Sequence, residues 1–356
     1  MRLSSLLVLS SLVGMSAPVA AAGPAAVADA WERPPVAAKL AERSVLLGAA
    51  QAGARLVAVG ERGIVVVSDD GGKRWAQSPT PVSVTLTAVR FADAEHGFAV
   101  GHAGTVLASA DGGRTWTRKL DGRRIAEFEL QAAKASGDSA KLKSAERFVA
   151  DGPDKPVLDL LVFDAQRVLV VGAYGIALET RDGGTTWTPW RARLDNPKEL
   201  HLYAVRKRGE RIVIAGEQGL LMQSSDAGAT FKRIATPYPG SFFTAELSAD
   251  AETVVAGLRG NAWRSTDNGA NWSQLASPMP VSITGSAVRA DGSLVFANQA
   301  GALLGSEGGA LKPLPGPQLP PLNGLLATTD GRMVALSIRG VHLVDGAAPI
   351  RPEPPR

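Results

Sequence analysis

Cysteine is absent from this 356-residue sequence, and histidine is scarce, with four residues. Without cysteine the chain can form no disulfide and can carry no lipid at a lipoprotein cysteine, so packing must supply its stability. The histidines are His96, His102, His201 and His342, and their spacing is not that of a zinc site. We therefore expect no metal and no other cofactor.

Long apolar runs are also absent, apart from the first 22 residues, so we expect no transmembrane segment. Residues 1–22 combine Arg2, the short apolar run LSSLLVLSSLVGM and the small residues Ala20–Ala22, a pattern typical of a cleaved signal peptide. The sequence therefore predicts a periplasmic or secreted protein that begins near Gly23. Residues 23–43 are expected to form an N-terminal extension, and residues 44–356 the main domain.

Charge of one sign is never concentrated. The net charge is +4, and lysine and arginine are spread along the chain. A nucleic-acid-binding surface needs a clustered basic patch, so we expect no nucleic-acid partner.

What the sequence does contain is a repeat. The motif [S/T]-x-D-x-G-x-x-[W/F] occurs five times, as SDDGGKRW (68–75), SADGGRTW (109–116), TRDGGTTW (180–187), SSDAGATF (224–231) and STDNGANW (265–272). A G-x-x-G element precedes each copy and ends at Gly63, Gly104, Gly175, Gly219 and Gly260, with weaker copies at Gly301 and Gly340. The last glycines of successive G-x-x-G elements are about 40 residues apart, a spacing typical of four-stranded propeller blades. One interval is longer by about 30 residues.

Each unit contains short runs of alternating apolar residues between glycine-rich turns, the pattern of antiparallel strands. Seven such units predict an all-β fold, a seven-bladed β-propeller. The ring closes in one of two ways, which the sequence leaves open: the last unit holds its own outer strand, or the segment before Ser44 supplies it.

Residues 121–156 interrupt the repeat between the second and third units, and they are rich in Ala, Glu, Lys and Arg. They predict one or two short helices, broken at SGD and ended by DGPDKP. Such an insertion is either a solvated decoration or an arm that docks a partner.

The acidic turn motif is interpreted as structural, because five equivalent aspartates around a ring cannot converge on one substrate. Its Asp and Ser/Thr side chains can bind backbone N–H groups of the turn, and its aromatic residue can fill the space between sheets. The residues assigned to this role are Asp70, Trp75, Asp111, Trp116, Asp182, Trp187, Asp226, Phe231, Asp267 and Trp272.

The opposite face of the propeller carries the G-x-x-G turns, whose middle residues differ from blade to blade. The binding candidates on this rim are Arg62, His102, Tyr174, Glu217, Arg259 and Arg339.

The acidic turn motifs resemble the bacterial-neuraminidase (BNR) or Asp-box repeat. Together with the seven G-x-x-G units and the signal peptide, they are similar to the photosystem II stability/assembly factor family. That resemblance implies a non-enzymatic scaffold or assembly factor that binds a subunit of a membrane or envelope protein complex through one propeller face. We expect the chain to be monomeric.

The alternative that the resemblance leaves open is a BNR-type glycoside hydrolase, similar to sialidases or xyloglucanases. A two-carboxylate glycosidase needs two acids near the ring centre, and the candidates are Asp159 and Glu246 on inner strands, with Glu61 and Glu217 on turns. A sialidase-like site is disfavoured, because the sequence has only three tyrosines (Tyr174, Tyr203 and Tyr238) and lacks the Arg-Ile-Pro signature.

Overall fold

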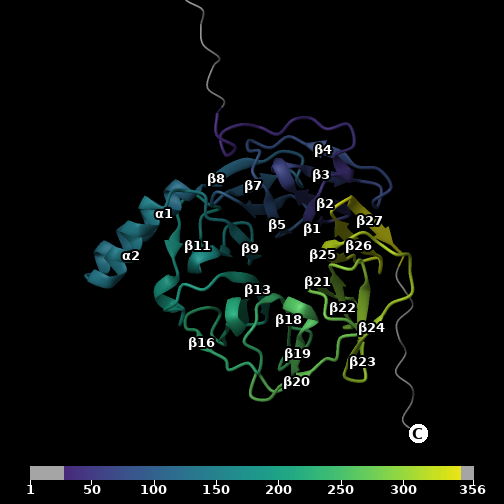
Figure 1. Cartoon of the computed structure of the whole chain (residues 1–356). Helices are drawn as coiled ribbons and strands as arrows, with labels where there is room; N and C mark the ends of the chain where they lie inside the picture. The colour runs from purple at the N-terminus through teal and green to yellow at the C-terminus, as the bar shows by residue number, and fades with distance from the viewer. Residues whose placement is uncertain (1–27, 346–356) are drawn as a thin grey trace, which may run out of the picture.

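The computed structural model describes residues 28–345, and the predicted signal peptide, residues 1–22, lies outside them. Seven antiparallel sheets surround a central axis (Figure 1). The predicted seven-bladed, all-β propeller is therefore confirmed. Among residues 28–345, no helix is both long and apolar enough to cross a bilayer.

The strands of each blade run outward from the axis in chain order. Blade 1 contains β1 (Leu46–Ala52), β2 (Arg55–Gly60), β3 (Val65–Ser68) and β4 (Ala76–Ser78). Blade 2 contains β5 (Leu86–Phe91), β6 (His96–Gly101), β7 (Val106–Ala110) and β8 (Thr117–Leu120). Blade 3 contains β9 (Val157–Val162), β10 (Val168–Gly172), β11 (Ala177–Thr180) and β12 (Thr188–Pro189).

Blade 4 contains β13 (Leu202–Arg208), β14 (Arg211–Gly216), β15 (Leu221–Ser224) and β16 (Lys232–Arg233). Blade 5 contains β17 (Phe242–Glu246), β18 (Thr253–Gly257), β19 (Ala262–Ser265) and β20 (Ser273–Gln274). Blade 6 contains β21 (Ile283–Val288), β22 (Leu294–Asn298), β23 (Leu303–Glu307) and β24 (Ala310–Pro313). Blade 7 contains β25 (Leu322–Ala327), β26 (Met333–Ser337) and β27 (Gly340–Val344).

The hydrophobic core lies between the sheets, because each cluster of buried side chains draws on two neighbouring blades. Val57 and Val65 of blade 1, for example, share a cluster with Leu86, Leu107 and Trp116 of blade 2. Strands β2 and β10 are buried at every position. Because sheets cover both of their faces, their sequences are nearly continuous apolar runs.

The insertion folds as predicted into two helices, α1 (Gly122–Ser136) and α2 (Ser139–Ala150), which we call the arm; they project from the left side of the molecule in Figure 1. Gly137 ends α1 in the left-handed conformation, and the Asp138 side chain accepts hydrogen bonds from the first amides of α2. Ile125 and Phe148 are buried in the core between blades 2 and 3, so the base of the arm is part of the core.

The ring closes, within residues 28–345, without a strand shared between blades 7 and 1. Blade 7 has three strands there, and the extension forms the 3-10 turn η1 (Ala41–Arg43) beside β27. Side chains join the two blades instead: Asn323 Nδ2 donates to Leu46 O at 3.0 Å, and Gln51 exchanges hydrogen bonds with Thr329.

The acidic turn motif binds its own backbone in all five copies. In blade 2, Ser109 Oγ donates to Asp111 Oδ1 at 2.8 Å and accepts from Gly113 N at 2.9 Å. Asp111 also accepts from Thr115 N at 2.9 Å. The same three hydrogen bonds occur in the other four copies, around Asp70, Asp182, Asp226 and Asp267.

The aromatic residue that ends each motif packs against the preceding blade. Trp116 and Trp187 are buried, and the indole N–H of each donates to a carbonyl oxygen within its own turn. Phe231 contacts Trp190 of blade 3 with ring centroids 5.9 Å apart. Trp75 and Trp272 are half-buried.

Replacing Trp187 by alanine is expected to lower the free energy of unfolding by about 3–5 kcal/mol, because a buried aromatic ring leaves a cavity between two sheets. Trp75→Ala is the matched control and should cost about half as much, since Trp75 is half-buried. Urea denaturation followed by circular dichroism measures both. Equal losses for the two variants would contradict this packing account.

The acidic turns predict a loss of stability in acid. Hydrogen bonds from side chains and amides lower the pKa of Asp182, Asp226 and Asp267 to about 2 in the folded chain, below the ordinary value of 3.8. Their stabilisation is complete above about pH 5 and is lost as the pH falls towards 2. Thermal melting between pH 5 and 2 should show this fall, and the triple Asp→Asn variant should melt lower at neutral pH with a flatter pH profile.

Candidate binding face and central channel

One face of the propeller carries both the G-x-x-G turns and the connections between blades. In blade 1, a Cβ on Gly63 would lie 2.0 Å from Val82 O of the connection to blade 2, and Gly63 has φ +72°. A Cβ on Gly60 would lie 2.0 Å from Val45 O. The connection passes directly beside Gly63, and the backbone at the start of the inner strand passes directly beside Gly60. Neither position has room for a side chain, so both require glycine.

The rim candidates lie on this face, but they are distributed around it. Tyr174 and Glu217 come together through His201, whose Nδ1 accepts from Tyr174 N at 2.9 Å and whose N donates to Glu217 Oε2 at 3.2 Å. The other candidates, on blades 1, 2, 5 and 7, are exposed: Arg62, His102, Arg259 and Arg339.

Each inner strand contains a bulge at its start, where one residue has no partner in the register. The bulged residues are Leu47, Thr87, Leu158, Tyr203, Phe243, Thr284 and Asn323. All seven line one cavity of about 140 Å³ on the axis. A bulge re-aims a side chain, and here it turns one residue of every blade towards the central channel.

Four aromatic side chains form what we call the aromatic ladder, which crosses blades 3, 4 and 5 beside this channel. Ring centroids are 4.9 Å apart between Tyr174 and His201, 6.1 Å between His201 and Tyr203, and 5.3 Å between Tyr203 and Phe243. All three contacts are edge-to-face, a favourable geometry for aromatic pairs. Tyr174 is 48% exposed, so the ladder offers an aromatic surface to solvent.

The polar bulge residues connect neighbouring blades. Thr87 donates to Val157 O at 2.9 Å, and Thr284 donates to Leu322 O at 2.7 Å; each acceptor belongs to the inner strand of the next blade. Asn323 makes the equivalent contact from blade 7 to blade 1. The ring is therefore held at its axis by side chain-to-backbone hydrogen bonds at three of its boundaries.

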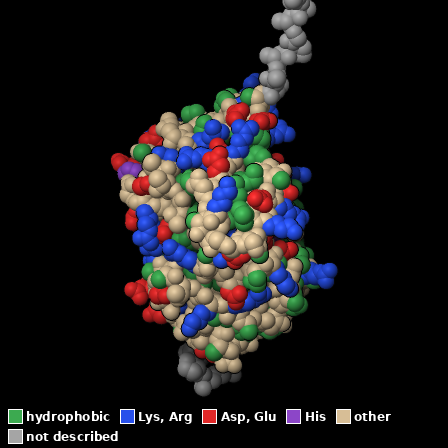
Figure 2. Space-filling view, turned by 90° about the vertical axis from the view of Figure 1, so that its left-hand side faces the viewer, with side chains coloured by type: hydrophobic (Ala, Val, Ile, Leu, Met, Phe, Trp, Pro, Cys, Tyr) green, Lys and Arg blue, Asp and Glu red, His purple; other side chains and the backbone are tan. Residues whose placement is uncertain are grey.

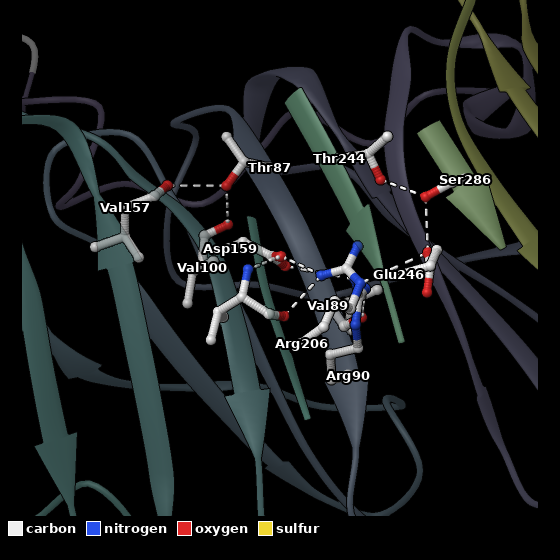
Figure 3. Close-up of polar contacts among 11 residues, drawn as sticks. Thr87, Val89, Arg90, Val100, Val157, Asp159, Arg206, Thr244, Glu246 and Ser286 are labelled. Atoms are coloured by element: carbon white, nitrogen blue, oxygen red, sulfur yellow. Dashed lines mark hydrogen bonds and ion pairs between the residues drawn. The ribbon is translucent and has the colours of Figure 1, made fainter. Parts of the chain in front are cut away.

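Alternating charges connect blades 2 to 5 inside the channel (Figure 3). Asp159 on β9 lies between two guanidiniums: its Oδ1 is 3.4 Å from Arg90 Nη2 and its Oδ2 is 2.5 Å from Arg206 Nη1. Arg206 Nε is 3.7 Å from Glu246 Oε1. Ser286 of blade 6 donates to the same Glu246 oxygen at 2.7 Å, which extends the network by one blade.

This pairing makes Asp159 unsuited to act as the general acid of the glycosidase mechanism considered from the sequence. A general acid must hold a proton near neutral pH. Burial opposes the charge on Asp159, but the guanidiniums of Arg206 and Arg90 outweigh it and lower the pKa of this carboxyl. Of the two turn candidates, Glu61 is exposed and Glu217 accepts from the backbone of His201.

The arm approaches the aromatic ladder through Arg191, on the 3-10 turn η4 (Arg191–Arg193). Its Nη2 donates to Tyr174 O at 2.9 Å, and its Nη1 donates to Glu199 Oε1 at 2.6 Å. Its Nε is 3.4 Å from Glu129 Oε2 on α1. On the side of the molecule that carries the arm, both signs of charge are interspersed with hydrophobic side chains (Figure 2).

Within the described part of the chain, no three His, Asp or Glu side chains gather in a way that would hold a metal ion. The residues that sequence reasoning missed are His201, Tyr203 and Phe243 as members of the ladder. The available signal was the position of Tyr203 and Phe243, each one residue after the first residue of its inner strand.

The seven sheets, the repeated turns and the central channel define the class of protein, which is a seven-bladed β-propeller with a helical arm. The model of the family described as photosynthesis system II assembly factor YCF48 matches residues 68–153 and 143–342. The chain therefore belongs to this family.

The photosystem II assembly lipoprotein Ycf48 of Synechococcus sp. (strain CC9902) is 32% identical over 77 residues, which span 22% of this chain and 23% of that relative. The solved structure of YCF48 bound to a D1 peptide superposes with a TM-score of 0.64, at 16% identity over 86% of this chain and 94% of that one. A GH74 xyloglucanase from Xanthomonas campestris has a TM-score of 0.57, at 15% identity over 87% of this chain and 54% of the enzyme. The two structural likenesses show the fold alone.

Replacing Arg206 by methionine is expected to lower the free energy of unfolding by about 3 kcal/mol, because Asp159 stays buried with only the longer contact to Arg90 and the hydrogen bond from the Val205 amide. The penalty should shrink as the pH falls towards 4, since the unpaired carboxyl can then take up a proton. Arg90→Met is the control and should cost less, because the Arg90 side chain is 35% exposed. Denaturation at pH 7 and pH 4 measures both, and a penalty that grows in acid would contradict the network.

Proposed function

We propose that this protein is an exported binding platform that holds an extended segment of a membrane-protein subunit during assembly of a larger complex. The segment binds to the aromatic ladder on the face that carries the G-x-x-G turns. Membership of the YCF48 family supports the role in assembly, and the D1 peptide bound to a relative of the same fold supports the nature of the partner. The sequence of residues 1–22 supports export.

The aromatic ladder is the observation that carries this proposal. Aromatic rings provide a large contact area at a low cost in conformational entropy. The edge-to-face contacts hold the rings against one another before any ligand arrives, so little ordering remains on binding. His201 Nδ1 accepts from the Tyr174 amide, which leaves Nε2 as the ring nitrogen that can donate.

The surroundings of the ladder are suited to a peptide. Tyr203 lies half-buried at the channel, where burial and the nearby carboxylate of Glu217 raise its pKa, so its hydroxyl stays protonated near neutral pH. Its O–H and the imidazole Nε2–H of His201 are donors that can pair with the carbonyl groups of an extended chain. The ladder therefore combines an apolar surface with donors for a backbone.

Replacing Tyr174 by alanine is expected to weaken binding of the D1-type peptide about tenfold, as for the loss of one aromatic anchor. The turn tolerates this change, because Ala103 occupies the equivalent position in blade 2 with φ 54°, the same value as Tyr174. Fluorescence anisotropy with a labelled peptide measures the affinity.

Ile338→Ala is the matched control for Tyr174→Ala. Ile338 is 47% exposed, close to the 48% of Tyr174, and it lies on the rim of blade 7, away from the ladder. Its replacement should leave the affinity within about twofold. Equal effects of the two variants, or no binding of the peptide to the unmodified chain, would overturn the proposal.

A further inference from the structure

A groove of about 540 Å³ lies between the arm and the connection that follows β12. Helix α1 lines it with Glu129, Ala132 and Ala133, and helix α2 lines it with Lys141, Ser144 and Ala145. These positions follow helical i, i+3 and i+4 spacing, so each helix presents one stripe to the groove. The alanines leave room for a slender side chain in the groove.

Glu129 is the unusual member of this lining. The residue is 6% exposed, and among the described residues its Oε1 has no hydrogen-bond partner. Its other oxygen, Oε2, is 3.4 Å from Arg191 Nε, which is an ion pair without a hydrogen bond. Burial raises the pKa of Glu129, which shows that this carboxylate is incompletely compensated.

The charges around the groove leave an excess of carboxylates. Glu129, Asp195 and Glu199 line it, against Arg191 and Lys141. Arg191 faces both Glu129 and Glu199, and Lys141 is 3.7 Å from Asp138. Lys155, which lies on the Phe148 ring, directs its ammonium to the carbonyl oxygens of Phe148 and Gly152. A cationic ligand is therefore complementary to the groove.

We propose that the arm groove binds one lysine side chain of an extended peptide segment, with the alkyl stem on the alanines and the ammonium on Glu129. Because the torsion of a glutamate carboxyl is broad, a small rotation presents its unpaired oxygen to the ligand. The inference rests on the proposed function for the origin of the segment, which is the membrane-protein partner. The inference adds that the partner segment carries a lysine.

Lysine suits this groove better than arginine. A guanidinium favours two parallel bonds to both oxygens of a carboxylate, and Oε2 of Glu129 already faces Arg191. An ammonium is a compact charge that needs a single oxygen, and its stem can pack against apolar surface. The groove should therefore rank lysine above arginine, and arginine above an uncharged side chain.

The test uses the full chain and four labelled peptides, acetyl-Ala-Ala-X-Ala-Ala-amide, with lysine, arginine, norleucine or glutamate as X. We expect the lysine peptide to bind with a Kd of about 1 mM or tighter. The norleucine peptide should bind about tenfold more weakly, since it lacks the charge-assisted hydrogen bond. NMR titration of the labelled protein measures the affinities and locates the shifted amides.

Three variants decide the assignment. Glu129→Gln keeps the shape and should make the lysine and norleucine peptides bind equally. Glu127→Gln changes an exposed carboxyl on the same helix and should leave all affinities unchanged. Ala132→Phe fills the groove from an exposed position and should weaken lysine and norleucine peptides alike.

The lysine assignment is overturned if the lysine peptide does not bind, or if its affinity is the same in Glu129→Gln and the unmodified chain. This outcome is distinct from failure of the proposed function, which concerns Tyr174 and the longer D1-type segment. Binding of that segment to the ladder in Glu129→Gln, with no lysine selectivity, would remove the inference alone. Lysine-selective binding without any effect of Tyr174→Ala on the longer segment would remove the proposed function alone.

Discussion

The polar contacts between inner strands at the axis are the interactions on which the rest of this structure depends. The sequence has no cysteine, and within residues 28–345 no strand is shared between the first and last blades. Neighbouring blades are joined at the axis by hydrogen bonds from Thr87, Thr284 and Asn323, and by the charge network centred on Arg206. The blades therefore keep fixed relative positions, which a binding surface that crosses three of them requires.

The same bulges that allow these contacts also create the candidate site. One bulged residue per blade turns towards the channel, and its chemistry varies around the ring. Thr87, Thr284 and Asn323 bind the neighbouring backbone, whereas Tyr203 and Phe243 contribute to the aromatic ladder. Structural and recognition roles are thus divided among equivalent positions, while the acidic turns of five blades, on the opposite face, bind their own backbone and pack an aromatic ring against the preceding blade.

Much of the fold could be predicted from the sequence, because the same turn motifs recur in most blades and each copy indicates the same local structure. The glycine turns and the acidic turns define where strands end, and the composition of residues 121–156 predicts helices. Contacts across the axis could not be predicted in the same way. A bulge is a shift of one residue, so Tyr203 and Phe243 could not be assigned to the channel from strand alternation, and the pairing of Asp159 with Arg90 and Arg206 depends on which blades become neighbours. The unpaired oxygen of Glu129 depends on burial, which local sequence does not reveal.

The measurement that tests the account most directly is hydrogen–deuterium exchange of the full chain with and without the D1-type peptide. The account predicts slower exchange in the turn that holds Tyr174, in the first residues of β13 and β17, and in the arm. Exchange in the acidic turns of the opposite face should be unchanged. Slower exchange confined to that opposite face, or to blades 6, 7 and 1, would contradict the assignment of the binding face.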